Sequence, residues 1–246
     1  MSDTKSGRFV MSKKTTSTKP IPGNPWLGVN WKNTVAGCDA KVITPVYCAQ
    51  HGIDYKNLPE PFSGAIDSKV VCLNLNPGWG DCESCFYGDP TFLKLTQNTL
   101  KHSTKDYLWD TPLGKSGKLH DGYTWRQDRT KVLRCALCPK PLKLFYLEFF
   151  PYHTKKAFAF PKALPSNDYR NYLLCKAMKE NKLIVLLRGK SHWFGIMDKC
   201  CDGQPLGEKL KQYGNLIIHK NPRNVYLTKN NFEPNDWEKL LTALRS

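Results

Sequence analysis

The chain has no apolar run approaching the roughly 18 residues that a membrane-spanning helix needs, so its sequence excludes a protein that crosses a bilayer by helices. The segment from Met1 to Lys5 lacks the apolar core of a signal peptide, and we therefore expect an intracellular protein, cytoplasmic if bacterial. Neither a glycine-rich phosphate loop nor a cluster of carboxylates is present. Their absence argues against a phosphate-binding α/β hydrolase that acts on nucleotides.

Acidic residues are also scarce relative to basic ones. The chain carries 21 Asp and Glu against 37 Lys and Arg, which gives a formal net charge of +16 at pH 7. A positive excess of this size indicates a polyanionic partner, and nucleic acid is the commonest polyanion. A basic surface without a binding role is the alternative.

The ten cysteines are expected to be mostly buried thiols rather than disulfides, because an intracellular compartment is reducing. Two Cys-x-x-Cys pairs, Cys82 with Cys85 and Cys135 with Cys138, have ligand spacing suited to zinc. Their positions oppose it, since the first pair follows the carboxyl end of one predicted strand and the second precedes the amino end of the next. Those ends are roughly 17–20 Å apart in a parallel sheet. The loop Pro139–Lys143 could close that gap, so zinc stays an alternative and no metal is assigned.

The 246 residues are divided into a tail and one domain. Residues 1–25 are rich in Ser, Thr, Lys, Gly and Pro, which is typical of a flexible basic tail, either a DNA-contacting arm or a solvated segment with no role. Residues 26–246 are predicted to form a single α/β domain. Four apolar runs have the length of buried strands: Val70–Leu75, Leu144–Phe150, Leu183–Leu187 and Leu216–Ile218.

Helical patterns separate these runs. We predict helices over Pro90–Lys101, Tyr123–Arg134 and Asp168–Asn181, the last capped by Asn167, and a final helix from about Pro234. Continuous apolar strands between helices indicate a three-layer α/β/α sandwich with a central, mostly parallel four-stranded sheet.

Polar turns follow the first and the last of these predicted strands. Asn76-Pro77-Gly78 comes after Val70–Leu75, and the segment from His219 to Asn224 comes after Leu216–Ile218. In open α/β sheets the ligand crevice lies at the carboxyl ends of the strands, so the two turns can meet over one pocket.

Three segments of this chain, in order, resemble motifs of the uracil-DNA glycosylase superfamily. They are Asn76-Pro77-Gly78, Glu148-Phe149-Phe150-Pro151 and His219-Lys220-Asn221-Pro222-Arg223-Asn224. The last is similar to the His-Pro-Ser-Pro-Arg-Asn pattern of the single-strand-selective monofunctional branch. The resemblance implies a uracil-DNA glycosylase-like fold and a monofunctional enzyme that flips a nucleotide out of DNA and hydrolyses its glycosidic bond.

The resemblance also implies roles for individual residues. Asn76 would orient the attacking water, and His219 would donate a hydrogen bond to the departing base. The alternatives are turn capping by Asn76 and an ordinary surface imidazole for His219. The remaining implied sites are Gly78, Phe86, Tyr87 and Glu148 for the base, and Lys190, Ser191, Asn221 and Arg223 for DNA. The mechanism needs no cofactor, and we expect a monomer whose partner is DNA.

Two departures from the family pattern bear on the substrate. Glu148 stands where the family usually has an asparagine that reads uracil, and an ionised carboxylate accepts hydrogen bonds from the amine of cytosine. A protonated Glu148 could still serve uracil, so this alternative stays open. Gly78 replaces a bulky tyrosine and leaves space beside C5. Together they favour a C5-modified cytosine and resemble bacterial antiphage glycosylases that excise glucosylated hydroxymethylcytosine. A uracil or damaged-pyrimidine repair glycosylase and a catalytically silent modified-DNA-binding protein remain alternatives.

Overall fold

The computed structural model describes residues 22–80, 83–103, 108–112, 114–115, 118–156, 160–161, 163–200 and 213–246. The predicted basic tail lies outside these ranges except for its last four residues. Within them, no helix combines the length and the apolar character that crossing a bilayer requires. Buried side chains from Trp26 to Leu241 form one continuous hydrophobic core.

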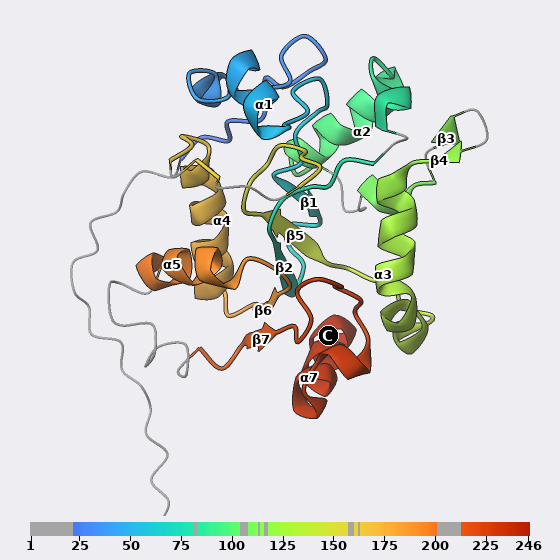
Figure 1. Ribbon diagram of the computed structural model, residues 1–246. Helices are drawn as coiled ribbons and strands as arrows, with labels where there is room; N and C mark the ends of the chain where they lie inside the picture. The colour runs from blue at the N-terminus through green and yellow to red at the C-terminus, as the bar shows by residue number, and fades with distance from the viewer. Residues whose placement is uncertain are drawn as a thin grey trace, which may run out of the picture.

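A five-stranded sheet forms the centre of the molecule (Figure 1). Its strands are β1 (Phe62–Gly64), β2 (Val70–Asn74), β5 (Phe145–Glu148), β6 (Leu183–Leu186) and β7 (Leu216–Ile218), in the order β1-β5-β2-β6-β7. The four predicted strands are present and parallel. The prediction of four strands in total is wrong, because β1 adds an antiparallel strand at the edge next to β5. The sequence of β1 is Phe-Ser-Gly, which contains one large apolar residue and forms no apolar run, whereas the equally short β7 is Leu-Ile-Ile.

Helices cover both faces of this sheet. The α-helices of the described chain are α1 (Pro45–His51), α2 (Pro90–Leu100), α3 (Asp121–Leu137), α4 (Asn167–Lys179), α5 (Lys190–Cys200) and α7 (Pro234–Arg245). In Figure 1, α4 and α5 lie on one side of the sheet and α3 and α7 on the other. Strands covered on both faces are continuously apolar, which is why the sequence revealed them. The α/β class is therefore confirmed.

Short elements complete the architecture. They are the 3₁₀ turns η1 (Gly37–Asp39), η2 (Glu83–Phe86), η3 (Leu108–Asp110) and η4 (Lys229–Asn231), and a small hairpin of β3 (Gly114–Lys115) with β4 (Lys118–Leu119). One detail of a predicted helix is wrong: Asn167 is the first residue of α4, and Ser166 occupies the N-cap position.

The cysteines differ from the expectation of buried thiols. Cys175 of α4 and Cys200 of α5 form a disulfide. The two helices pack together and place the Cα atoms 5.1 Å apart, within the usual range for a bridge. Among the free cysteines of the described residues, Cys48 and Cys72 are buried, whereas Cys38, Cys85, Cys135 and Cys138 are exposed.

The predicted zinc alternative is not supported by the described residues. Cys82 lies outside them, and no group of three or more His, Cys, Asp or Glu side chains within them could hold a metal ion.

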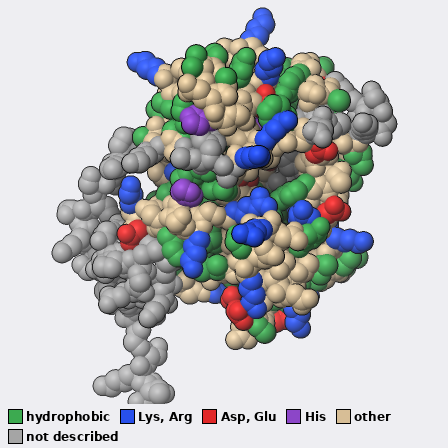
Figure 2. All heavy atoms as spheres, viewed as in Figure 1, with side chains coloured by type: hydrophobic (Ala, Val, Ile, Leu, Met, Phe, Trp, Pro, Cys, Tyr) green, Lys and Arg blue, Asp and Glu red, His purple; other side chains and the backbone are tan. Residues whose placement is uncertain are grey.

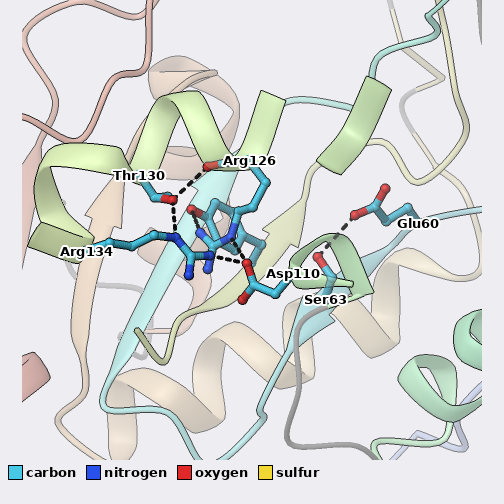
Figure 3. Close-up of polar contacts among 7 residues, drawn as sticks. Glu60, Ser63, Asp110, Arg126, Thr130 and Arg134 are labelled. Atoms are coloured by element: carbon cyan, nitrogen blue, oxygen red, sulfur yellow. Dashed lines mark hydrogen bonds and ion pairs between the residues drawn. The ribbon is translucent and has the colours of Figure 1, made fainter. Parts of the chain in front are cut away.

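A buried arginine attaches α3 to the sheet (Figure 3). Arg126 Nη1 donates a 2.6 Å hydrogen bond to the hydroxyl of Tyr146 on β5, and its Nε lies 3.4 Å from Asp110. Asp110 also binds Arg134, whose Nε donates to Thr130. Because these contacts fix the helix against β5, they also fix its first turn, which borders the cavity described next.

Candidate active site

A cavity of about 610 Å³ opens at the carboxyl ends of β2, β5 and β6. From β2 the chain continues to β5 on one side of the sheet, and from β6 it continues to β7 on the opposite side. The strand order therefore reverses between β2 and β6, next to this cavity. Ligands of open α/β sheets bind at such a point. Its walls are Glu60, the turn from Asn74 to Gly80, the first turn of α3 with Trp125, Glu148, the segment from His153 to Lys156, Arg188, and the pair Pro222 and Arg223.

Asn76 lines the cavity with its side chain held in one orientation. Its amide Nδ2 donates to the hydroxyl of Thr154 at 2.8 Å and to the carbonyl of Pro77 at 3.0 Å. Because the nitrogen is committed to these acceptors, the oxygen Oδ1 is left as a fixed acceptor. Such an acceptor can position a water molecule.

Glu148 ends β5 directly beside Asn74 at the end of β2. Asn74 Nδ2 donates to Glu148 Oε1 at 2.9 Å. The other oxygen atoms of the pair, Glu148 Oε2 and Asn74 Oδ1, are buried and have no hydrogen-bond partner among the described residues. A buried polar pair with two unsatisfied atoms at a cavity wall is suited to bind a polar ligand.

Burial keeps the carboxyl group of Glu148 largely neutral. Desolvation raises the pKa of Glu148 to about 8, and the neighbouring Glu60 raises it further, whereas the Asn74 hydrogen bond and the charge of Arg188 oppose the rise. A neutral carboxyl group both donates and accepts hydrogen bonds. At neutral pH the raised pKa favours the protonated form of Glu148, which is the alternative to the ionised, acceptor-only form.

Gly78 lies in the cavity wall, and its surroundings are open. A Cβ atom at this position would meet no other atom within 4 Å. The ring of His153 donates from Nδ1 to the carbonyl oxygen of Gly78 at 2.6 Å, which holds the turn against the segment that follows β5. A larger side chain would therefore have room at this position.

Basic side chains surround the cavity. Lys155, Lys156 and Arg223 are exposed at its edge, and Arg188 is half-buried inside it. Figure 2 shows Lys and Arg side chains on both sides of a hollow in the centre of the displayed face. The cavity also contains the acidic side chains Glu60 and Asp121, and Glu60 accepts a hydrogen bond from Ser63 of β1 (Figure 3).

His219 does not share this cavity. Its ring is buried, with Nδ1 accepting from the backbone N–H of Asn221 at 3.1 Å and Nε2 lying 2.9 Å from the carbonyl oxygen of Tyr226. An acceptor at Nδ1 requires the proton at Nε2, so the ring donates to Tyr226. Burial lowers the pKa of His219 and favours this neutral form. The prediction that His219 faces a ligand together with Asn76 and Glu148 is wrong, because its own loop occupies both ring nitrogens.

The predicted aromatic pair also lies elsewhere. Phe86 is buried in the core against Phe92 and His120, and the hydroxyl of Tyr87 binds Asp54. Neither lines the cavity, so the prediction that they stack on a base is wrong. Two tryptophans line it instead, Trp79 and Trp125.

Three of the residues predicted to contact DNA lie outside the cavity wall. Lys190 and Ser191 are exposed at the start of α5. Lys190 lines a neighbouring hollow of about 510 Å³, which also borders His219 and shares Arg188 and Pro222 with the cavity. Asn221 Oδ1 accepts from the backbone N–H groups of Arg223 and Asn224. This side chain therefore stabilises its own turn, and of the predicted DNA contacts only Arg223 lines the cavity.

Several cavity residues were not predicted from the sequence. Trp79 follows Asn76-Pro77-Gly78 directly, and His153 and Thr154 follow the Glu148-Phe149-Phe150-Pro151 segment, so proximity to the motifs could have identified them. Arg188 follows the predicted strand Leu183–Leu187, where a carboxyl end indicates a pocket. Trp125, near the start of a predicted helix, carries no such signal.

Comparison of the chain with models of known protein families, with curated proteins and with solved structures finds no match.

Proposed function

We propose that this protein is a monofunctional DNA glycosylase that hydrolyses the N-glycosidic bond of a flipped-out, C5-modified cytosine and leaves an abasic site. The observation that carries the proposal is that Asn76 and Glu148, from distant segments, line one cavity. One presents a fixed acceptor and the other an unpartnered buried carboxyl oxygen. These are the groups that hydrolysis of an extruded nucleotide needs, one for water and one for the base.

The size and charge of the cavity support a nucleic-acid substrate. Its volume of about 610 Å³ lies within the range of small-molecule sites and accommodates a nucleoside with an added group. The open space at Gly78 provides room for a substituent such as glucosylated hydroxymethyl at C5. Lys155, Lys156 and Arg223 at the edge can bind phosphates on either side of the extruded nucleotide.

Uracil or a damaged pyrimidine is a second candidate substrate, because Glu148 is largely neutral. Its O–H can donate to N3 of cytosine while its carbonyl accepts from the amine, but the same group can donate to O4 of uracil and accept from N3–H. The space at Gly78 therefore supports a C5 substituent more strongly than Glu148 supports cytosine over uracil.

A test with three DNAs separates these possibilities. Wild type and Asn76→Ala are incubated with glucosylated hydroxymethylcytosine DNA, uracil DNA and unmodified DNA, and abasic sites are quantified by alkaline cleavage. We expect abasic sites in the modified DNA, and a loss of about 100-fold or more in Asn76→Ala with DNA affinity retained.

The other outcomes decide against parts of the proposal. Abasic sites in the uracil DNA alone would overturn the preference for modified cytosine and leave the uracil enzyme. Specific binding of modified DNA without release of any base would identify a catalytically silent binding protein.

A further inference from the structure

Arg188 lies in the loop that follows β6 and lines the cavity. Its Nε donates to the carbonyl oxygen of Pro222 at 3.1 Å and its Nη2 to that of Arg223 at 3.4 Å, so the loop after β7 holds the guanidinium group in place. Its remaining nitrogen, Nη1, makes no hydrogen bond with the described residues. Arg188 thus presents a fixed cation with a donor still available.

The proposed reaction requires such a group. When the bond from C1′ to N1 breaks, its electron pair stays with the base, which leaves as an anion with charge on its ring nitrogens and O2. The oxygen of water bonds to C1′ and releases a proton to solvent, and the base anion takes up a proton from solvent. Because charge develops on the base in the transition state, a donor or cation beside it accelerates bond cleavage.

His219 cannot provide this donor in the observed arrangement, since both its ring nitrogens bind backbone groups. Among the basic residues of the cavity, Lys155 lies over the ring of Trp79 with its Nζ 4.7 Å from the centroid, and Lys155, Lys156 and Arg223 are exposed to water. Water screens exposed charges, whereas a half-buried charge acts through a lower effective dielectric.

We propose that Arg188 stabilises the negative charge on the departing base. This inference rests on the proposed glycosylase function and assigns the catalytic cation of that site. The neutral form of Glu148 strengthens it, because an ionised carboxylate beside Arg188 would cancel part of the positive charge.

The test compares two substrates that differ mainly in how well the base leaves. Single-turnover release is measured from DNA containing 5-hydroxymethylcytosine or 5-formylcytosine, two C5 groups of similar size. The formyl group withdraws electrons and makes the base anion more stable. If Arg188 stabilises that anion, Arg188→Gln should slow release of the hydroxymethyl base by about 100-fold to 1,000-fold. The fold-loss for the formyl base should be smaller than this by a factor of about ten or more.

Variants and controls separate a charge effect from a structural one. Arg188→Lys retains a charge and should keep more activity than Arg188→Gln. If the glutamine variant folds poorly, the fold-losses of the lysine variant on the two substrates are compared instead. Lys179→Gln removes an exposed charge at the end of α4 and should match wild type. DNA affinity of both Arg188 variants should stay within about threefold of wild type, since phosphates are bound by the exposed residues.

Each result has a defined meaning. Equal losses on both substrates would show that Arg188 only positions the loop after β7, and wild-type rates in Arg188→Gln would show that it has no role; either overturns the inference while leaving the glycosylase function intact. If wild type releases neither of these bases and no glucosylated hydroxymethylcytosine, the proposed action on C5-modified cytosine fails and this inference fails with it.

Discussion

The hydroxyl group of Thr154 accepts a 2.8 Å hydrogen bond from the side-chain amide of Asn76. The same hydroxyl donates to the backbone carbonyl of Lys156 at 3.0 Å, so its proton is already committed and its lone pair faces Asn76. The orientation of the residue that we propose to hold water is therefore set by a residue from the segment after β5. This relationship joins the Asn76-Pro77-Gly78 motif to the segment that follows the Glu148-Phe149-Phe150-Pro151 motif.

Replacing Thr154 with valine should impair catalysis through Asn76. Valine has nearly the same shape but cannot accept the amide proton, so the Asn76 side chain keeps only its bond to the Pro77 carbonyl and is less firmly oriented. We expect base release to slow by roughly 10-fold to 100-fold, with DNA affinity unchanged, in single-turnover assays. Thr154→Ser keeps the hydroxyl and should restore most of the rate. Equal rates for the valine and serine variants would show that this bond does not position Asn76.

Glu148 should make the stability of the protein depend on pH. Its pKa of about 8 in the folded protein lies above the ordinary value of 4.5, so between these values the folded protein keeps a proton that the unfolded chain loses. The stability that this raised pKa contributes is therefore fully present below about pH 4.5 and is lost as the pH rises through 8. At about 1.4 kcal/mol per unit of pKa difference, the loss is a few kcal/mol.

Urea unfolding between pH 5 and pH 9 measures this effect. Glu148→Gln is neutral at every pH, so it should flatten the decline and exceed wild type in stability at pH 9. A variant that declines as steeply as wild type would show that Glu148 is not the group responsible.

Lys155 and Lys156 should bind DNA through its phosphates. Replacing both with glutamine should weaken binding of modified and unmodified DNA alike, because phosphate contacts carry no sequence information. The slope of log affinity against log salt should fall by about 2 in magnitude for duplex DNA. Fluorescence anisotropy over a salt series measures both quantities, with Lys179→Gln as the matched control. An unchanged slope would place the DNA on another surface.

His219 should contribute to stability rather than directly to catalysis. His219→Ala removes the acceptor of the Asn221 N–H and a donor to Tyr226 in a buried loop, and should lower the free energy of unfolding by about 1–3 kcal/mol. Below the melting transition, the folded variant should retain more activity than Arg188→Gln. An unchanged free energy of unfolding together with a 100-fold or greater rate loss, as large as that of Arg188→Gln, would restore His219 as the donor to the base.

The sheet could be predicted because its parallel strands are buried on both faces and read as continuous apolar runs. The shared position of Asn76 and Glu148 followed from the same pattern, since β2 and β5 are neighbours and their carboxyl ends meet. The short strand β1 could not be predicted, because Phe62-Ser63-Gly64 forms no apolar run and the strand is defined by its backbone pairing with β5.

The orientation of side chains at the site was harder to predict. His219 stands at a strand end as expected, but hydrogen bonds within its own turn direct the ring away from the cavity. Arg188 belongs to no motif, and its role depends on carbonyl groups of a loop distant in sequence. Sequence patterns report which strand ends meet, whereas tertiary hydrogen bonds decide which side chains face the ligand.

Mass spectrometry of free bases released from a panel of modified DNAs tests the central claim most directly. Wild type is predicted to release an intact C5-modified cytosine and leave an abasic sugar, and Asn76→Ala is predicted to release none under the same conditions. Release of the same base at the wild-type rate by Asn76→Ala, or no base from any DNA of the panel, would contradict a glycosylase site built on Asn76 and Glu148.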